Sequence, residues 1–223
     1  MRKGKNIKKV PFGFTLVEIA IVLVIIGLLL GGVLKGQELV NSAKVKNLAN
    51  DFRAVSSFIY AYQDRFRALP GDDPSADTHL DGGTNATTPA GRTRARIDGA
   101  WNSTTQTDES YLFWQHVRLA GLATGTSVVT SNDYIPRNAE GGAIGVTSNP
   151  VITTPTSPFP ANFYICSQGI QGRYVRQIDT TIDDGNTQTG SVRAITDNAA
   201  TVVNAENVMA TNDADFYTVC MGF

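Results

Sequence analysis

Side chains that could do chemistry are scarce in this 223-residue sequence. They include a pair of cysteines, Cys166 and Cys220, and a pair of histidines, His79 and His116. Neither pair has the clustered spacing of a zinc site. The glycine-rich stretch GGAIG lacks the lysine and the strand-to-helix context of a phosphate-binding loop. The sequence therefore predicts a protein that is not an enzyme.

One acidic segment, IDTTIDDGN, places Asp179, Asp183, Asp184 and Asn186 around a glycine. Carboxylate and amide oxygens of this kind suit Ca²⁺, which takes about six to eight oxygen ligands. The spacing does not match an EF-hand, however, and Asp184-Gly185 is also a strong hairpin-turn dipeptide. Turn chemistry alone explains these residues. We therefore expect a hairpin turn and no cofactor here, with Ca²⁺ binding as the alternative.

A single carboxylate interrupts the most apolar part of the chain, GFTLVEIAIVLVIIGLLLGGVLKG at residues 13–36. The uncharged run Ile19–Leu34 has 16 residues, fewer than the ~20 that cross a bilayer as a helix. Including residues 14–17 restores the length but places Glu18 in the membrane. A charge there costs about 2.5–3.5 kcal/mol on insertion scales. We therefore expect this carboxylate to have a partner.

Charge is distributed unevenly along the chain. Residues 1–13 carry five basic side chains and no acid, whereas the remainder has 14 basic and 20 acidic side chains. An acidic body argues against binding nucleic acid by bulk charge. A positive flank before an apolar run stays cytoplasmic, which places the rest of the chain on the other side of the membrane. No small-residue cleavage site of a secretory signal follows the run.

The residues Gly13-Phe14-Thr15-Leu16-Val17-Glu18, behind a basic leader and ahead of an apolar helix, resemble the processing site of type IV pilins and type II secretion pseudopilins. The resemblance implies that a prepilin peptidase cuts between Gly13 and Phe14 and methylates the new amine of Phe14. It also implies that Glu18 neutralises the cationic terminus of a neighbouring subunit, because a buried charge is tolerated once it is paired.

The same resemblance implies where the chain resides and what it assembles with. We expect a single-pass protein of the bacterial inner membrane with its head in the periplasm, which then enters an extracytoplasmic filament. Its partners would be membrane lipid, the peptidase, an inner-membrane assembly platform and other pilin or pseudopilin subunits. The alternative is a low-copy minor subunit whose head binds a surface, DNA or a secreted substrate, although the acidic head disfavours DNA.

The elements that position these residues begin with one long helix. After the apolar half, residues 14–36, an amphipathic half over residues 37–69 carries apolar side chains three or four residues apart. They are Val45, Leu48, Phe52, Val55, Ile59, Tyr62, Phe66 and Leu69. Pro70 and Gly71 predict the end of the helix, so that residues 70–223 form a globular head.

Within the head, residues 69–93 are rich in turn formers and acids and predict a long surface loop. A short helix is expected within residues 107–122, capped at Asp108 and stopped at Gly121, with its aromatic side chains in the core. Short β-prone runs follow, at residues 126–130, 149–154, 162–166, 172–179, 190–195 and 215–220. One long helix packed on a small antiparallel sheet is an α+β fold.

Both cysteines end β-prone aromatic runs, and the charge pattern places them in an oxidising compartment, where two cysteines more often pair than stay free. A Cys166–Cys220 disulfide would resemble the disulfide-bounded C-terminal region of type IV pilins. Two buried thiols are the alternative.

Overall fold

The computed structural model of the chain describes residues 15–87, 95–154 and 159–223. These residues belong to two compact units, residues 1–43 and residues 44–223, which are described separately. The basic leader and the predicted processing residues Gly13 and Phe14 lie outside the described residues.

The first unit consists of the beginning of helix α1, which spans Leu16–Phe66. Its apolar side chains are exposed all round, from Leu16 at 85% to Leu34 at 67%. Within the described part of the chain, α1 is the one helix long and apolar enough to cross a membrane, by length and composition alone. The structure thus confirms the predicted apolar N-terminal helix.

The rest of α1 belongs to the second unit and buries one face. The predicted stripe is confirmed from Val45 to Tyr62, because its buried residues recur at helical spacing: Val45, Leu48, Ala49, Phe52, Val55, Ile59 and Tyr62. Of the last two predicted members, Phe66 is only partly buried, and Leu69 is buried beyond the end of the helix, which was expected to reach residue 69. The helix ends at Phe66, and Arg67 follows with a φ of 56°. Gly71 has a φ of 93°, and a Cβ there would collide with the backbone carbonyl of Glu109. Only glycine fits this close approach of the turn to the next helix.

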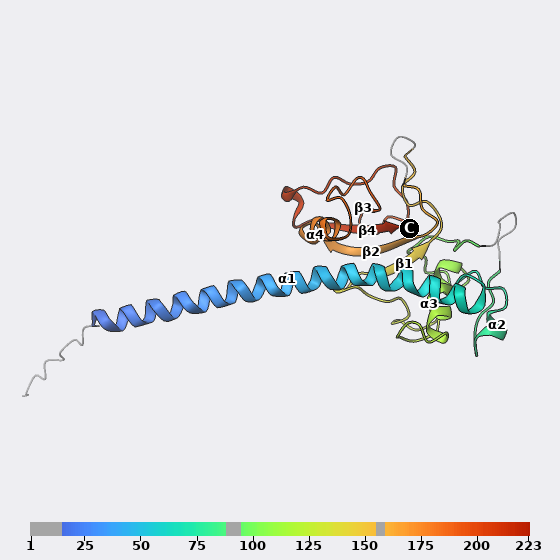
Figure 1. Cartoon of the computed structure of the whole chain (residues 1–223), viewed down its shortest axis with the longest axis horizontal. Helices are drawn as coiled ribbons and strands as arrows, with labels where there is room; N and C mark the ends of the chain where they lie inside the picture. The colour runs from blue at the N-terminus through green and yellow to red at the C-terminus, as the bar shows by residue number, and fades with distance from the viewer. Residues whose placement is uncertain (1–14, 88–94, 155–158) are drawn as a thin grey trace, which may run out of the picture. The chain divides into compact units, whose positions relative to one another are not determined.

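The head contains one antiparallel sheet in the order β1-β2-β4-β3. Its strands are β1 (Ile144–Thr147), β2 (Tyr164–Gln171), β3 (Val192–Thr196) and β4 (Phe216–Gly222). Three helices and one 3-10 turn complete the described part of the head: α2 (Ala76–His79), α3 (Glu109–Leu119), α4 (Gly172–Ile182) and η1 (Ala210–Asn212). The α+β fold is therefore confirmed (Figure 1).

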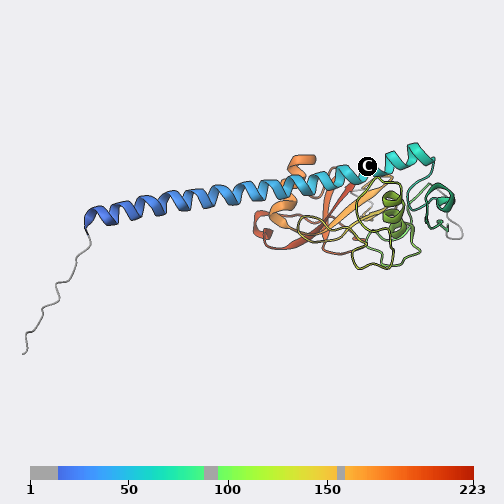
Figure 2. The same ribbon diagram turned by 90° about the horizontal axis from the view of Figure 1, so that it is seen from below.

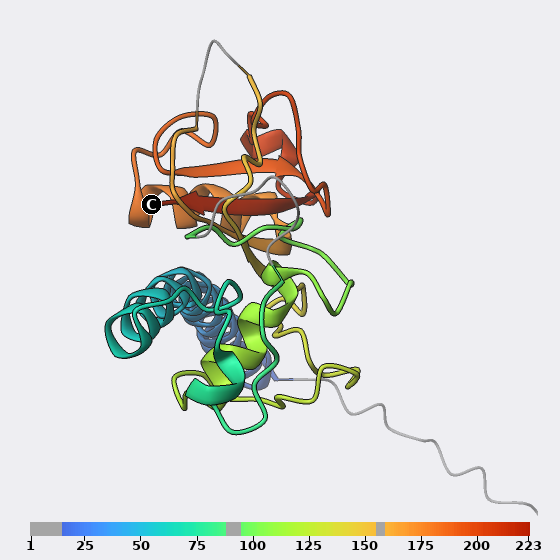
Figure 3. The same ribbon diagram turned by 90° about the vertical axis from the view of Figure 1, so that its right-hand side faces the viewer.

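The sheet separates two apolar clusters. On one side, strand residues such as Ile165 and Val219 pack with the buried stripe of α1, with Phe113 of α3 and with Tyr174 of α4. Figures 2 and 3 show the strands alongside the second half of α1, with α3 on the same side of the sheet. The opposite face packs a smaller cluster: Trp101, Val151, Ile152, Phe159, Tyr164, Cys166, Ile195 and Cys220. Strands β2, β3 and β4 therefore send side chains to both clusters, one from each face of the sheet.

One predicted strand is wrong. Residues 172–179 form most of helix α4, not a strand. The segment is rich in β-prone residue types, yet its buried apolar side chains are Tyr174, Val175 and Ile178, a spacing that lies on one helix face. Tertiary packing against β2, β3 and β4 selects the helix over the local propensity.

Other head elements also differ from expectation. Residues 126–130 form no strand and expose Val128, and residues 149–154 make only an isolated bridge from Ile152 to Val202. Strand β1 was not predicted. The expected surface loop contains the short helix α2 and buries Asp72, Asp73, Ala76 and Leu80. The helix over residues 107–122 is confirmed as α3, with Asp108 at its N-cap position and Gly121 just beyond its end.

The packing of α1 predicts that two of its aromatic residues, Phe52 and Tyr60, contribute very differently to the free energy of unfolding. Phe52 is 1% exposed within the main cluster, whereas Tyr60 is 57% exposed. We expect Phe52→Ala to lower the free energy of unfolding by about 3–5 kcal/mol through the cavity it leaves. Tyr60→Ala should lower it by at most about 1 kcal/mol. Chemical denaturation of the full chain in detergent measures both, and equal losses would contradict this packing.

Candidate functional site

Glu18 lies at the start of α1, where its carboxylate has a local partner. Its Oε2 accepts hydrogen bonds of 2.8 Å from both the backbone N–H and the side-chain hydroxyl of Thr15. The Thr15 hydroxyl in turn accepts a 3.3 Å bond from the N–H of Glu18. Threonine at the N-cap and glutamate three residues later form a capping box. Sequence reasoning missed this arrangement, although the T-x-x-E pattern is its signal.

The capping box is followed by a broad exposed apolar surface in the same unit. Side chains from Leu16 to Leu34 are 46–85% exposed where they are large and apolar. Gly27, Gly31, Gly32 and Gly36 lie in open space, and a Cβ added to any of them would have no neighbour within 4 Å. A contiguous apolar surface of this extent marks contact with a membrane or with another protein. Small residues on it allow close approach of a second helix.

The predicted disulfide is confirmed. Cys166 on β2 and Cys220 on β4 are directly paired across the sheet, with Cα atoms 4.1 Å apart. Both side chains are fully buried. The two cysteines are 54 residues apart in the sequence, and closing that segment stabilises the fold by about 4 kcal/mol on the chain-entropy relation. The bond thereby joins the two central strands of the sheet, β2 and the C-terminal strand β4.

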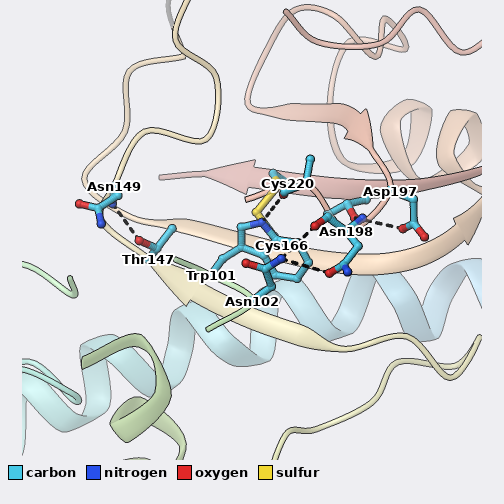
Figure 4. The surroundings of a disulfide bond; sticks show 10 residues. Trp101, Asn102, Thr147, Asn149, Cys166, Asp197, Asn198 and Cys220 are labelled. Carbon is cyan, nitrogen blue, oxygen red and sulfur yellow. Dashed lines mark hydrogen bonds between the residues drawn. A yellow bond between two sulfur atoms is a disulfide. The ribbon is translucent and has the colours of Figure 1, made fainter. Parts of the chain in front are cut away.

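Trp101 covers this disulfide on the face of the sheet opposite α1 (Figure 4). Its indole N–H donates a 2.8 Å hydrogen bond to the carbonyl of Ala199, and the Asn102 amide donates a 2.9 Å bond to the carbonyl of Asn198. Asn198 has a φ of 56°, and its N–H donates to the hydroxyl of Thr218 on β4. These bonds hold the loops that exclude water from the sulfur atoms.

The acidic segment brings together three of its four predicted residues. One carboxylate oxygen from each of Asp179, Asp183 and Asp184 lies within 4.8 Å of the others. Asn186 instead shapes the turn, donating its N–H to Asp184 and accepting a bond from the N–H of Gln188. The chain bends at Gly185, which has a φ of 83°, but this segment connects helix α4 to β3, so the predicted hairpin is wrong.

A buried polar network near the end of α1 was not predicted. Asp73 is fully buried, and its Oδ2 accepts a 2.7 Å bond from the hydroxyl of Tyr62 and lies 2.6 Å from His79 Nδ1. Its Oδ1 accepts the N–H of Ser75. Burial alone would raise the pKa of Asp73, but the bonds from His79, Tyr62 and Ser75 together lower it below its ordinary value. Because residues 69–93 are rich in turn formers, the sequence predicted a surface loop and not a buried carboxylate at Asp73.

The side chain of His116 connects two segments of the fold by hydrogen bonds. Its Nδ1 accepts a 2.9 Å hydrogen bond from the N–H of Gly71, so Nε2 carries the proton and donates to the carbonyl of Thr84 at 2.8 Å. Burial lowers the pKa of His116. The neutral ring therefore joins α3 to the segment that follows α1.

No protein-family model matches the sequence, and no curated protein is similar enough to count as a relative. The architecture itself is informative. A long apolar N-terminal helix, a small antiparallel sheet and a disulfide between two of its strands are consistent with a pilin-like architecture.

The Asp73 network predicts a pH-dependent contribution to stability. Because the pKa of Asp73 is lowered in the folded state, its contribution is present above about pH 4 and is lost as the pH falls through the folded pKa. We expect Asp73→Asn to lower the free energy of unfolding by about 1–3 kcal/mol at about pH 6, and by less at about pH 3. Denaturant titrations at both pH values test this.

Asp81→Asn provides the matched control, since Asp81 is an exposed carboxylate in the same segment. It should change stability little at either pH. A loss for Asp73→Asn that is the same at both pH values would contradict the role of its charge.

Proposed function

We propose that this chain is a subunit of a type IV pilus-like or type II secretion pseudopilus filament. It is processed by a prepilin peptidase and assembled through its N-terminal helix. The observation that carries the proposal is the start of that helix: the Gly13-Phe14 junction, the Thr15–Glu18 capping box and the uncharged run that follows.

The exposed apolar half of α1 supports a role in assembly. Its side chains have no cover within their own unit, so water contact is unfavourable along the whole run. A bilayer covers them before assembly, and the helices of neighbouring subunits cover them in a filament. We place the head outside the cytoplasm, because the basic residues before the run remain on the cytoplasmic side.

Glu18 has a second role in this proposal. Both of its bonds from Thr15 end on Oε2, and Oε1 is the atom we assign to the amine of a neighbouring subunit. The capping box orients the carboxylate at the end of the helix, and pairing with the amine removes an unpaired charge from an apolar environment. A membrane helix that does not assemble with other subunits would gain the cap from Glu18, but its charge would have no partner amine.

Processing is the first test. Mass spectrometry of the N-terminal peptide, from cells that contain a prepilin peptidase, should find a mature chain that begins at N-methyl-Phe14. Gly13→Val is the control, and it should leave the basic leader attached. An intact Met1 leader in assembled material, or cleavage beyond Gly31, would contradict the proposal.

Substitutions at Glu18 test assembly. Glu18→Gln keeps a capping-box acceptor but removes the charge, whereas Glu18→Ala removes both. We expect both variants to be inserted and processed, and to enter filaments at least about tenfold less well. The reason is that the partner amine is left buried and unpaired, a loss of several kcal/mol. Sheared filaments are quantified against processed subunit that remains in the membrane.

Thr15→Ala separates the two roles of Glu18. It removes the cap, at about 1 kcal/mol of helix stability, but keeps the charge, so filament entry should change little. Normal filament entry of Glu18→Gln would refute pairing and leave capping as the role of Glu18. If the chain is a low-copy subunit, filament entry of the same variants is measured by their co-purification with the filament.

A further inference from the structure

Three aromatic side chains from different segments of the head meet beside the second half of α1. Tyr60 lies on α1, Phe163 precedes β2 and Phe223 follows β4. The ring centroids of Tyr60 and Phe223 are 6.0 Å apart, and those of Phe163 and Phe223 are 5.7 Å apart. Tyr60 is 57% exposed, and both phenylalanines are partly buried. Together the three rings form a partly exposed surface, here called the aromatic shelf.

Backbone hydrogen bonds hold the two phenylalanines of the shelf in place. The N–H of Phe223 donates a 3.1 Å bond to the carbonyl of Phe163, and the carbonyl of Phe223 accepts bonds from the N–H groups of Phe163 and Asn162. An extended peptide that adds to a sheet needs free backbone donors and acceptors. The N–H and carbonyl of both phenylalanines are already bonded, so the shelf presents side chains to a ligand.

The aromatic shelf lines a hollow of about 350 Å³. A second hollow of about 320 Å³ adjoins it at Tyr60 and Gln63, and a third of about 800 Å³ adjoins it at Asn162 and Phe223. Ligand sites typically measure about 300–1,000 Å³ and combine aromatic walls with a few polar groups. The three adjoining hollows therefore form a groove with room for a chain of linked units.

Two amide side chains flank the shelf within the groove. Gln63 comes from α1 and Asn162 from the segment before β2, and both residues are exposed. Neither amide hydrogen-bonds to another residue in the described part of the chain, and neither does the hydroxyl of Tyr60. An amide offers two donors and an acceptor. These groups suit a ligand that both donates and accepts hydrogen bonds beside an apolar surface.

The charges of the groove are balanced. Arg96 Nε lies 3.8 Å from Asp98, and its Nη2 donates a 2.7 Å bond to the carbonyl of Ser148. Arg67 lies 3.7 Å from Asp64 in the second hollow. Among the described residues that line the three hollows, each cation therefore has a carboxylate beside it. Without an excess of either sign, the groove favours an uncharged ligand.

We propose that this groove binds a neutral oligosaccharide, with a sugar ring on the aromatic shelf and its hydroxyls bonded to Gln63 and Asn162. A pyranose ring carries C–H groups on its faces, which pack on aromatic rings, and hydroxyls around its edge, which both donate and accept. The adjoining hollows receive the rings linked to it. The groove lies entirely within the second unit, so this inference does not depend on the proposed filament function.

The experiment uses the full chain in a detergent without a sugar headgroup, so that the detergent does not compete for the groove. Four neutral hexamers serve as probes: cellohexaose, N-acetylchitohexaose, maltohexaose and mannohexaose. Hexagalacturonate is the charged probe of the same length. Calorimetry measures affinity, and saturation-transfer NMR detects which sugar protons contact the protein. At least one neutral hexamer should bind at least about tenfold more tightly than hexagalacturonate.

Variants of the lining residues locate the site. Tyr60→Ala removes the exposed ring and should weaken binding of that hexamer at least about tenfold. Because the ring is exposed, its removal should leave the fold intact. Tyr60→Phe keeps the ring and should bind within about threefold of the wild type. Gln63→Ala and Asn162→Ala should each weaken binding about two- to tenfold.

Phe216→Ala and Gln177→Ala are the matched controls. Phe216 is an aromatic residue with 53% exposure, and Gln177 is an exposed amide on α4. Neither lines the three hollows. Both variants should bind the hexamer like the wild type.

The proposal is overturned if none of the four neutral hexamers binds at millimolar concentration, or if one binds equally well to the wild type and to Tyr60→Ala. Tighter binding of hexagalacturonate than of every neutral hexamer also overturns it. A proline-rich peptide is the remaining probe, because aromatic-lined grooves also accept polyproline helices. If that peptide binds in a Tyr60-dependent way while the neutral hexamers do not, the occupant is a peptide and the proposal is wrong.

Discussion

Burial of one face of α1 between residues 45 and 62 is the interaction on which the head depends. The sheet, α3 and α4 each have an apolar face, and all three pack into one cluster with this stripe. No single element could bury its own apolar face, so the helix supplies their common surface. The apolar residues before residue 44 have no part in that core, which is why their surface requires a different environment.

The antiparallel sheet divides its side chains between two environments. Ile165 and Val219 face α1, whereas their neighbours Cys166 and Cys220 face the opposite cluster. A shift of one residue in the register of β4 would exchange these faces and separate the sulfur atoms. The disulfide and the core packing therefore specify the same register, and Trp101 protects the bond on its outer face.

Three carboxylates of this chain differ in their burial and in their hydrogen-bond partners. Glu18 is exposed and bonded to a nearby residue in the sequence, and Asp73 is buried with three partners around it. Asp179 is equally buried but lacks a hydrogen bond of normal geometry among the described residues. Desolvation is similar for the two buried groups, so the difference lies in what the fold brings to them.

The sequence by itself determined what depends on neighbours along the chain. The extent of α1, its buried stripe, the cap position and stop of α3, and the T-x-x-E start of α1 all follow from local spacing. The helical spacing of Tyr174, Val175 and Ile178 is present in the sequence, but only tertiary packing selected it over the β propensity of residues 172–179. Only the tertiary structure decided that residues 144–147 form a strand. It also decided that Asp73 and Asp179 are buried. The physical reason is that burial and strand pairing depend on contacts between segments far apart in sequence, which no local pattern records.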